Sequence, residues 1–165
     1  MFPAELTEKA RELLSACEAR ELLLATAESC TGGLVSGCLT AVPGSSRVVE
    51  RGFVTYTNRA KHEMLGVPMP LFESVGAVSE AVARAMADGV LAQAPVSLAL
   101  SVTGVAGPGA SERKPAGLVY IGCALAGAAT VVEEHRFAGD RDAVRRLSVE
   151  GALTLALRRV RSEVG

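Results

Sequence analysis

The chain has 165 residues, of which 49% are hydrophobic and 21% charged, with 17 glycines and few aromatic residues. Its length corresponds to about one domain with its own core, and its composition is typical of a compact α/β protein rather than a disordered or fibrous one. The formal net charge of −1 gives no overall field that attracts nucleic acid or an anionic membrane, so a bound anion must be held by a local cluster.

Cysteine usage and the absence of long apolar runs exclude further classes of protein. The four cysteines form no CxxC pair and have no nearby histidine, so neither a disulfide framework nor a zinc site is predicted. The first 20 residues mix charged and apolar side chains, unlike a signal or transit peptide. No apolar run reaches the roughly 20 residues of a membrane helix. We expect a cytoplasmic protein with no metal, no nucleic-acid partner and no membrane association.

Apolar spacing divides the first half of the chain into alternating helices and strands. It predicts an amphipathic helix over residues 3–20 and a short buried strand over residues 22–26. Residues 28–33 are interpreted as a tight turn leading into a helix of roughly ten residues. Residues 48–56 are rich in β-forming side chains and are predicted to be a strand.

The turn after the first predicted strand contains two hydroxyls, a thiol and paired glycines. Ser29 would stand at the carboxyl end of that strand. The amides of Thr31, Gly32 and Gly33 would point out of a helix start, which suits a nucleophile and an anion. The sequence therefore predicts a chemical site at this turn.

Two further junctions follow predicted strands. Tyr56 ends the second strand, and Asn58 is interpreted as the cap of a short helix that carries Lys61 and terminates at Gly66. A strand over residues 96–102 is followed directly by a glycine-rich loop. Ligands in open α/β sheets lie at the carboxyl ends of strands, so these junctions are where we expect the site.

The second half of the chain contains two more helices and a hairpin. Ser79 is predicted to cap a helix, after an irregular segment over residues 68–75, and Asp140 to cap the last helix. Residues 117–125 and 130–137 read as two strands joined by a turn. We predict a single domain over residues 1–165, an α/β fold in which a mixed, mostly parallel sheet lies between helices in a three-layer α/β/α sandwich.

Ser29 is a weak nucleophile unless a base removes its proton. His62 and His135 lie in contexts that give a Ser-His-Asp arrangement little support, and both the GxSxG and SxxK patterns are absent. Among the three lysines, Lys61 alone stands beside a strand end, and an amine buried against Tyr56 would be neutral enough to act as a base. The alternative to a catalytic role is a serine that only caps a helix and a lysine that points to water.

Other residues offer weaker signals. Cys30 is a rival nucleophile in the same turn, although a buried cysteine more often acts as a small apolar side chain. Arg141 and Arg145 lie one helical turn apart and would hold a phosphate together with the loop over residues 104–109. Alternatively, the run that contains these arginines is a solvated helix face.

Taken together, the motifs resemble one family, the C-terminal domain of the competence/damage-inducible protein CinA, whose stand-alone members are nicotinamide-nucleotide amidohydrolases. The resemblance spans about residues 5–160. It is carried, in order, by residues 27–33 (AESCTGG), 43–46 (PGSS), 51–56 (RGFVTY), Lys61, 76–80 (GAVSE), 103–108 (TGVAGP), 114–115, 139–141 and 144–145. It implies deamidation of nicotinamide mononucleotide to nicotinate mononucleotide and ammonia, an α/β/α fold, no metal or other cofactor, and self-association as a homodimer or higher oligomer. Longer relatives carry an additional N-terminal domain, which we do not expect here.

The resemblance also assigns roles to residues of this chain. Ser29 would attack the carboxamide carbon, Lys61 would accept and return the proton, and Tyr56 would orient or relay it. Thr31 stays open as an alternative nucleophile. The implied substrate contacts are Thr31, Gly32, Gly33, Ser46, Thr103, Gly104, Gly107, Arg141 and Arg145. The alternative function is a nucleotide-binding or regulatory module that retains the pocket without catalysis.

Overall fold

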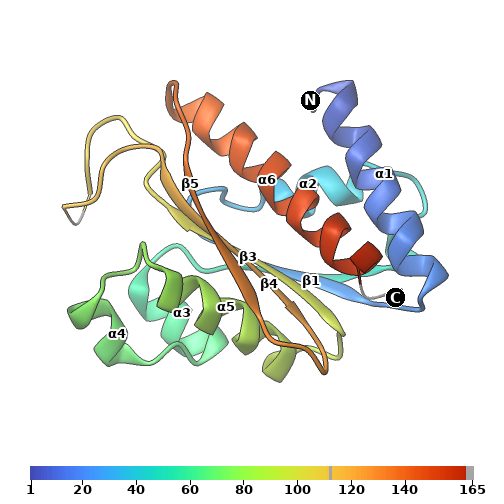
Figure 1. The fold of residues 1–165 in the computed structure, drawn as a ribbon, viewed down its shortest axis with the longest axis horizontal. Coiled ribbons are helices and arrows are strands. Elements are labelled where there is room, and N and C mark those ends of the chain that lie inside the picture. The colour runs from blue at the N-terminus through green and yellow to red at the C-terminus, as the bar shows by residue number, and fades with distance from the viewer. Residues whose placement is uncertain (112, 163–165) are drawn as a thin grey trace.

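Helices cover both faces of a five-stranded sheet in the computed structural model, which describes residues 1–111 and 113–162 (Figure 1). The helices are α1 (Ala4–Ala19), α2 (Leu34–Thr40), α3 (Asn58–Leu65), α4 (Met69–Ser74), α5 (Glu80–Gln93) and α6 (Arg141–Ser162), with a 3₁₀ helix η1 (Ser45–Arg47). The strands are β1 (Leu24–Glu28), β2 (Val49–Val54), β3 (Leu98–Gly104), β4 (Leu118–Leu125) and β5 (Val131–Arg136). The predicted three-layer α/β/α sandwich is confirmed.

The strands are arranged in the order β2-β1-β3-β4-β5. β1 pairs in parallel with β2 and β3, whereas β4 is antiparallel to β3 and β5. Four strands therefore run in one direction and only β4 runs in the other, so the prediction of a mixed, mostly parallel sheet is confirmed. The hairpin predicted near the end of the chain is formed by β4 and β5.

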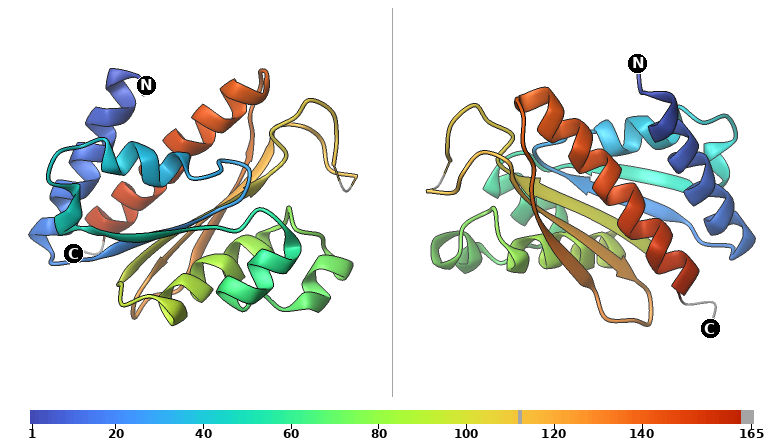
Figure 2. Two further views of the ribbon diagram at one scale, coloured as in Figure 1. Left: turned by 180° about the vertical axis from the view of Figure 1, so that it is seen from behind. Right: turned by 45° about the horizontal axis from the view of Figure 1, so that its top comes forward.

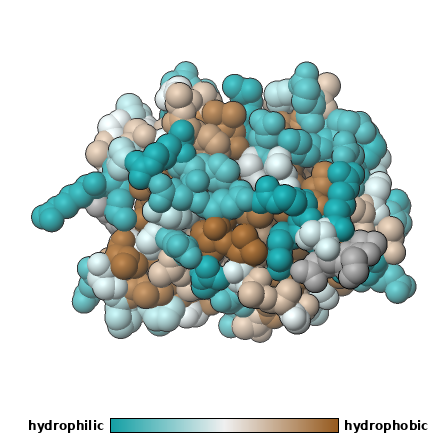
Figure 3. Space-filling model, viewed as in Figure 1, coloured by the Kyte–Doolittle hydropathy of each residue, from teal (hydrophilic) through white to brown (hydrophobic). Residues whose placement is uncertain are grey.

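Each face of the sheet packs against its own group of helices. α1, α2 and α6 lie on one side, and α3, α4 and α5 lie on the other, as the views in Figures 1 and 2 show. Alternation along the strands separates the two cores, since Leu24 and Leu100 face the first group of helices while Ala25 and Ala99 face the second. Outside these cores, the surface seen in Figure 3 is mostly hydrophilic.

Small residues bring α5 close to the sheet. The Ser101 hydroxyl of β3 donates to the Ala83 carbonyl of α5 at 2.6 Å. A Cβ added to Gly122 of β4 would lie 3.0 Å from the same carbonyl oxygen. The helix backbone therefore rests almost directly on the strands, which leaves no room for larger side chains at these positions.

Two local expectations are corrected by the structure. Thr57, not Asn58, caps α3, because the Thr57 hydroxyl accepts a hydrogen bond from the Ala60 amide at 3.0 Å. The segment over residues 68–75 is not irregular but contains the short helix α4, whose first turn accommodates Pro70 because the first amides of a helix need no partner within it. The predicted caps at Ser79 and Asp140 are confirmed by their hydrogen bonds to Val82 and Ala143.

We expect Gly89→Ala to destabilise the protein far more than Gly151→Ala, although both glycines lie in helices. A Cβ at Gly89 would lie 2.1 Å from the carbonyl oxygen of Leu65, a backbone atom that moves only if α3 moves. At Gly151 the closest atom is the terminal methyl of Ile121 at 2.7 Å, which a side-chain rotation can displace. Overpacking typically costs about 1–3 kcal/mol, so we expect urea unfolding to show a loss of about 2 kcal/mol or more for Gly89→Ala. Equal losses for the two variants would contradict this account of the α3–α5 contact.

Candidate active site

The segments that follow β1, β2 and β3 meet at one edge of the sheet, because these strands are parallel and adjacent. The backbone of the first junction is fixed from both sides. The Ser29 amide donates to the Val102 carbonyl of β3 at 3.0 Å, and the Thr55 amide after β2 donates to the Glu28 carbonyl at 2.8 Å. A pocket of about 270 Å³ opens at this edge, between the turn after β1, the start of α3 and the loop after β3.

Ser29 and Lys61 form a hydrogen-bonded pair in this pocket. The Lys61 Nζ lies 3.1 Å from the Ser29 Oγ, although the two residues come from different junctions. The main-chain carbonyl of Tyr56 accepts from both side chains, at 3.3 Å from Nζ and 3.4 Å from Oγ. The Lys61 side chain is 1% exposed and Ser29 is 8% exposed. The arrangement places an amine, a hydroxyl and one orienting carbonyl together at the inner end of the pocket.

Two glycines and a carboxylate shape the turn that carries Ser29. Gly32 and Gly33 have φ angles of +59° and +100°, a region that favours glycine. The Gly32 amide closes the turn on the Ser29 carbonyl at 2.9 Å. The buried Glu28 carboxylate accepts from the Val35 amide at 2.8 Å and the Ser36 amide at 3.0 Å, so the first amides of α2 are already paired. Of the three amides expected to face an anion, that of Gly32 is therefore occupied within the turn.

The structure places Thr31 differently from Ser29. Thr31 is fully buried, its Oγ1 has no hydrogen-bond partner in the part of the chain that the structure describes, and the residue does not line the pocket. Ser29 lines the pocket and contacts Lys61. The geometry therefore brings Ser29, and not Thr31, to the amine.

Cys30 lines the pocket beside Ser29, but it is buried and belongs to the core formed with α1, α2 and α6. Burial raises the pKa of Cys30 to about 11. A thiol with this pKa is almost entirely protonated at neutral pH, and only the thiolate is a good nucleophile. The reading of Cys30 as a rival nucleophile therefore loses its chemical basis.

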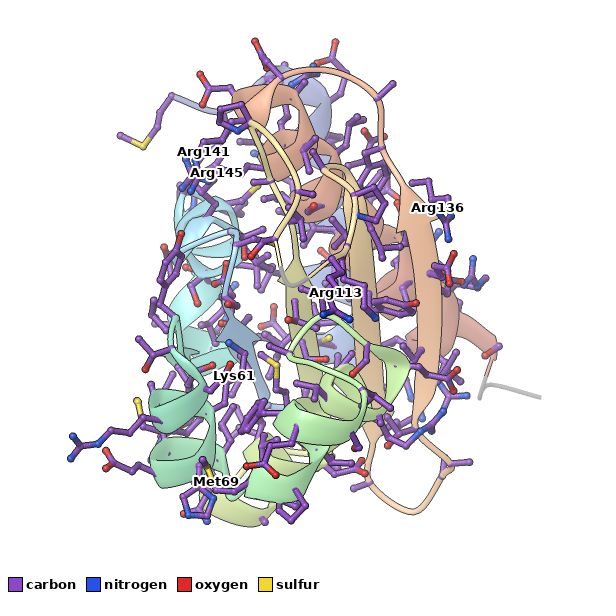
Figure 4. All side chains as sticks on the ribbon, turned by 90° about the vertical axis from the view of Figure 1, so that its left-hand side faces the viewer. Lys61, Met69, Arg113, Arg136, Arg141 and Arg145 are labelled. Atoms are coloured by element: carbon purple, nitrogen blue, oxygen red, sulfur yellow. The ribbon has the colours of Figure 1, made fainter. Side chains whose placement is uncertain are left out.

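The two predicted arginines occupy different environments. Arg141 lines the pocket, where Nη1 donates to the Gly107 carbonyl at 2.6 Å and Nη2 donates to the Tyr56 hydroxyl at 3.2 Å. Arg145, one turn further along α6, donates instead to the Cys30 and Thr31 carbonyls, at 3.1 and 3.3 Å, and does not line the pocket. Figure 4 looks onto this edge of the sheet; Arg141 and Arg145 lie together, and Lys61 lies below them in this view.

Some of the remaining predicted substrate contacts line the pocket and others do not. Thr103, Gly104 and Gly107 line the pocket, with the Thr103 hydroxyl donating to the Ala77 carbonyl at 2.8 Å. Ser46 is an exposed residue of η1, ahead of β2, whereas Ser29 follows the parallel strand β1. Ser46 therefore lies at the opposite edge of the sheet and does not reach this pocket. Gly32 and Gly33 shape the turn without lining the pocket.

Sequence reasoning missed several residues of the pocket wall. Asn58 lines the pocket, and its side chain is available there because Thr57 performs the capping that was assigned to Asn58. Ala77 and Val78, just before α5, also line it. The motif at residues 76–80 contained the signal for them, but no chemistry marks an alanine or a valine as a contact residue.

Among residues 1–111 and 113–162, no three His, Cys, Asp or Glu side chains group in a way that would hold a metal ion. Within the same ranges, no helix combines the length and the apolar character needed to cross a membrane.

Known proteins resemble the chain over nearly its whole length. The nicotinamide-nucleotide amidohydrolase PncC of Enterobacter agglomerans is 45% identical over 159 residues, which cover 96% of this chain and 97% of the relative. PncC of Escherichia coli K12 is 45% identical over 154 residues, 93% of each chain. A putative competence-damage inducible protein of Caldicellulosiruptor bescii is 46% identical over 142 residues, and this chain spans about a third (34%) of its length.

Solved structures agree with these sequence relationships. The crystal structure of the competence/damage inducible protein CihA from Agrobacterium tumefaciens superimposes with a TM-score of 0.91 at 42% identity, covering 96% of this chain and 98% of that one. A sequence model of the CinA C-terminal domain matches residues 6–160. The chain therefore belongs to the CinA C-terminal domain family.

Proposed function

We propose that this protein is a nicotinamide-nucleotide amidohydrolase that converts nicotinamide mononucleotide to nicotinate mononucleotide and ammonia. Relatives named for this activity match almost from end to end at 45% identity. The observation that carries the mechanistic part is the 3.1 Å contact between the Ser29 hydroxyl and the buried Lys61 amine. A binding module would need a pocket and cations but not this pair.

In the proposed first half-reaction, the Ser29 Oγ attacks the carboxamide carbon while its proton passes to the Lys61 Nζ. Burial disfavours a charged amine, and only the neutral amine has a lone pair to accept a proton. The Tyr56 carbonyl contacts both groups and would hold the lysine with its lone pair toward the serine. The carbon–nitrogen bond then breaks, the departing nitrogen takes the proton from Lys61, and ammonia leaves.

In the second half-reaction a water molecule replaces ammonia. Lys61 accepts a proton from this water as its oxygen attacks the ester carbon, and returns the proton to the Ser29 Oγ as nicotinate mononucleotide departs. The tetrahedral oxyanion of both steps needs nearby amide donors. The Gly32 amide is occupied in its turn, and Thr31 and Gly33 do not line the pocket, so none of these three amides is assigned to the oxyanion.

The nucleotide part of the substrate would extend along the loop after β3 toward Arg141. This guanidinium is exposed, lines the pocket and links the Gly107 carbonyl to the Tyr56 hydroxyl across its opening. A phosphate dianion would form stronger charge-assisted hydrogen bonds with Arg141 than these neutral oxygens do. We therefore assign phosphate recognition to Arg141.

Incubation of the purified protein with nicotinamide mononucleotide tests the function. Stoichiometric ammonia and nicotinate mononucleotide are expected, measured by a coupled ammonia assay and by chromatography. Folded protein that binds the nucleotide without releasing ammonia would overturn the proposal and favour the non-catalytic binding module.

Three accompanying expectations stay predictions. These are the homodimer or higher oligomer, the cytoplasmic location and the lack of nucleic-acid partners.

A further inference from the structure

The mechanism above gives no role to Arg145, although its guanidinium contacts the backbone directly after Ser29. We propose that Arg145 is a positioning residue for amide hydrolysis, which fixes and polarises the backbone directly after Ser29 and does not hold the phosphate of the nucleotide. The proposal rests on the amidohydrolase function proposed above. It separates the two arginines that residue spacing alone groups together.

The first argument is the pairing of the guanidinium. Arg145 Nε donates to the Cys30 carbonyl at 3.1 Å, and Nη2 donates to the next carbonyl, that of Thr31, at 3.3 Å. Two nitrogens of one planar group thus contact two consecutive peptide oxygens, a geometry that the single nitrogen of a lysine does not reproduce. Arg145 is partly buried and does not line the pocket that contains Ser29. Arg145 therefore contacts the turn and not a molecule bound in this pocket.

The second argument is the flexibility of the turn. Gly32 and Gly33 both adopt left-handed conformations, and glycine backbones have many alternative states of similar energy. A Cβ built on Gly32 would lie 3.5 Å from Arg145 Nη2, so the guanidinium packs directly over the turn. Arg145 therefore restricts the segment that must stay in place while Ser29 attacks.

The third argument is electrostatic. In a trans peptide the N–H points opposite to the C=O, so the bond from Arg145 to the Cys30 oxygen turns the Thr31 N–H away from the arginine. A cation bound to the oxygen draws electron density through the peptide and makes that N–H a stronger donor. The peptide that follows Ser29 and Cys30 is therefore oriented and polarised by a nearby charge, without contact between Arg145 and substrate.

The test compares steady-state constants of wild type, Arg145→Met, Arg145→Lys and the matched control Arg146→Met, with nicotinamide mononucleotide as substrate. Arg146 is the exposed neighbour on the same helix, so its variant removes the same charge without affecting the turn. We expect Arg145→Met to lower kcat by about 10- to 100-fold with KM changed by less than about twofold. Arg145→Lys, which retains the charge but only one donor nitrogen, should fall between it and wild type. Ribose 5-phosphate, a competitor with a phosphate but no carboxamide, should inhibit all four proteins equally.

Two results would overturn the inference. A rise in KM and in the inhibition constant of ribose 5-phosphate with unchanged kcat would make Arg145 a phosphate ligand. An unchanged kcat with unchanged KM would make it a simple tie between α6 and the turn. Thermal unfolding checks each variant, and Arg145→Lys decides the question if Arg145→Met does not fold. Wild-type protein without activity would instead refute the proposed function, a result visible before any variant is compared.

Discussion

Ser29→Ala is expected to lower kcat for nicotinamide mononucleotide by about 10³-fold or more, because removal of a nucleophile eliminates the covalent pathway rather than weakening one contact. The residual rate would come from the intact pocket. KM should change little, since the hydroxyl is a small part of the binding surface. The variant removes one partner of the buried Lys61 amine, which keeps the Tyr56 carbonyl, so a loss of about 1 kcal/mol in stability is expected. Ammonia release under single-turnover and steady-state conditions measures the effect.

Thr31→Val in the same assay distinguishes the two hydroxyls that sequence reasoning left open. Valine has nearly the shape of threonine, and the Thr31 Oγ1 has no partner within residues 1–111 and 113–162, so this change should leave the fold unchanged or slightly more stable. If Thr31→Val abolishes turnover while Ser29→Ala retains it, the nucleophile is Thr31 and the proposed chemistry of the Ser29–Lys61 pair is wrong.

The sequence predicted the layers of this fold well because each layer has a local signature. Periodicity marked the long helices, β-branched runs marked the strands, and the caps at Ser79 and Asp140 were correctly identified. The capping error arose where two neighbouring residues satisfy the same rule. Thr57 and Asn58 are both good capping residues, and only the structure decides which of them precedes the first turn of α3.

The part of the site that lies directly after strands could be predicted from the sequence. Residues following β1, β2 and β3 converge because adjacent parallel strands end at the same edge, which brought Ser29, Lys61 and Thr103 together as expected. Ser46 was assigned by family resemblance, and its position ahead of a strand places it at the other edge. The different environments of Arg141 and Arg145 depend on contacts more than 30 residues away, which helix spacing does not reveal.

Lys61→Met is expected to lower kcat by about 10²- to 10⁴-fold, the usual contribution of a positioned base. Methionine has a similar length and no charge, so burial at this position no longer imposes the desolvation cost of an amine. We therefore expect the melting temperature of the variant to equal or exceed that of wild type while activity falls. Lys9→Met is the matched control, because Lys9 lies on α1 in contact with Glu150 and Thr154 of α6, on the opposite face of the sheet from Lys61.

Opposite changes in stability and activity would distinguish a catalytic lysine from a structural one. Replacement of a lysine retained for packing would lower both stability and activity, whereas a base kept in a buried position lowers stability for the benefit of the reaction. Folded Lys61→Met that keeps kcat within about tenfold of wild type would fall short of the contribution of a general base and require another proton acceptor for Ser29. The 3.1 Å contact between Nζ and Oγ would then be a feature of the resting pocket without a role in proton transfer.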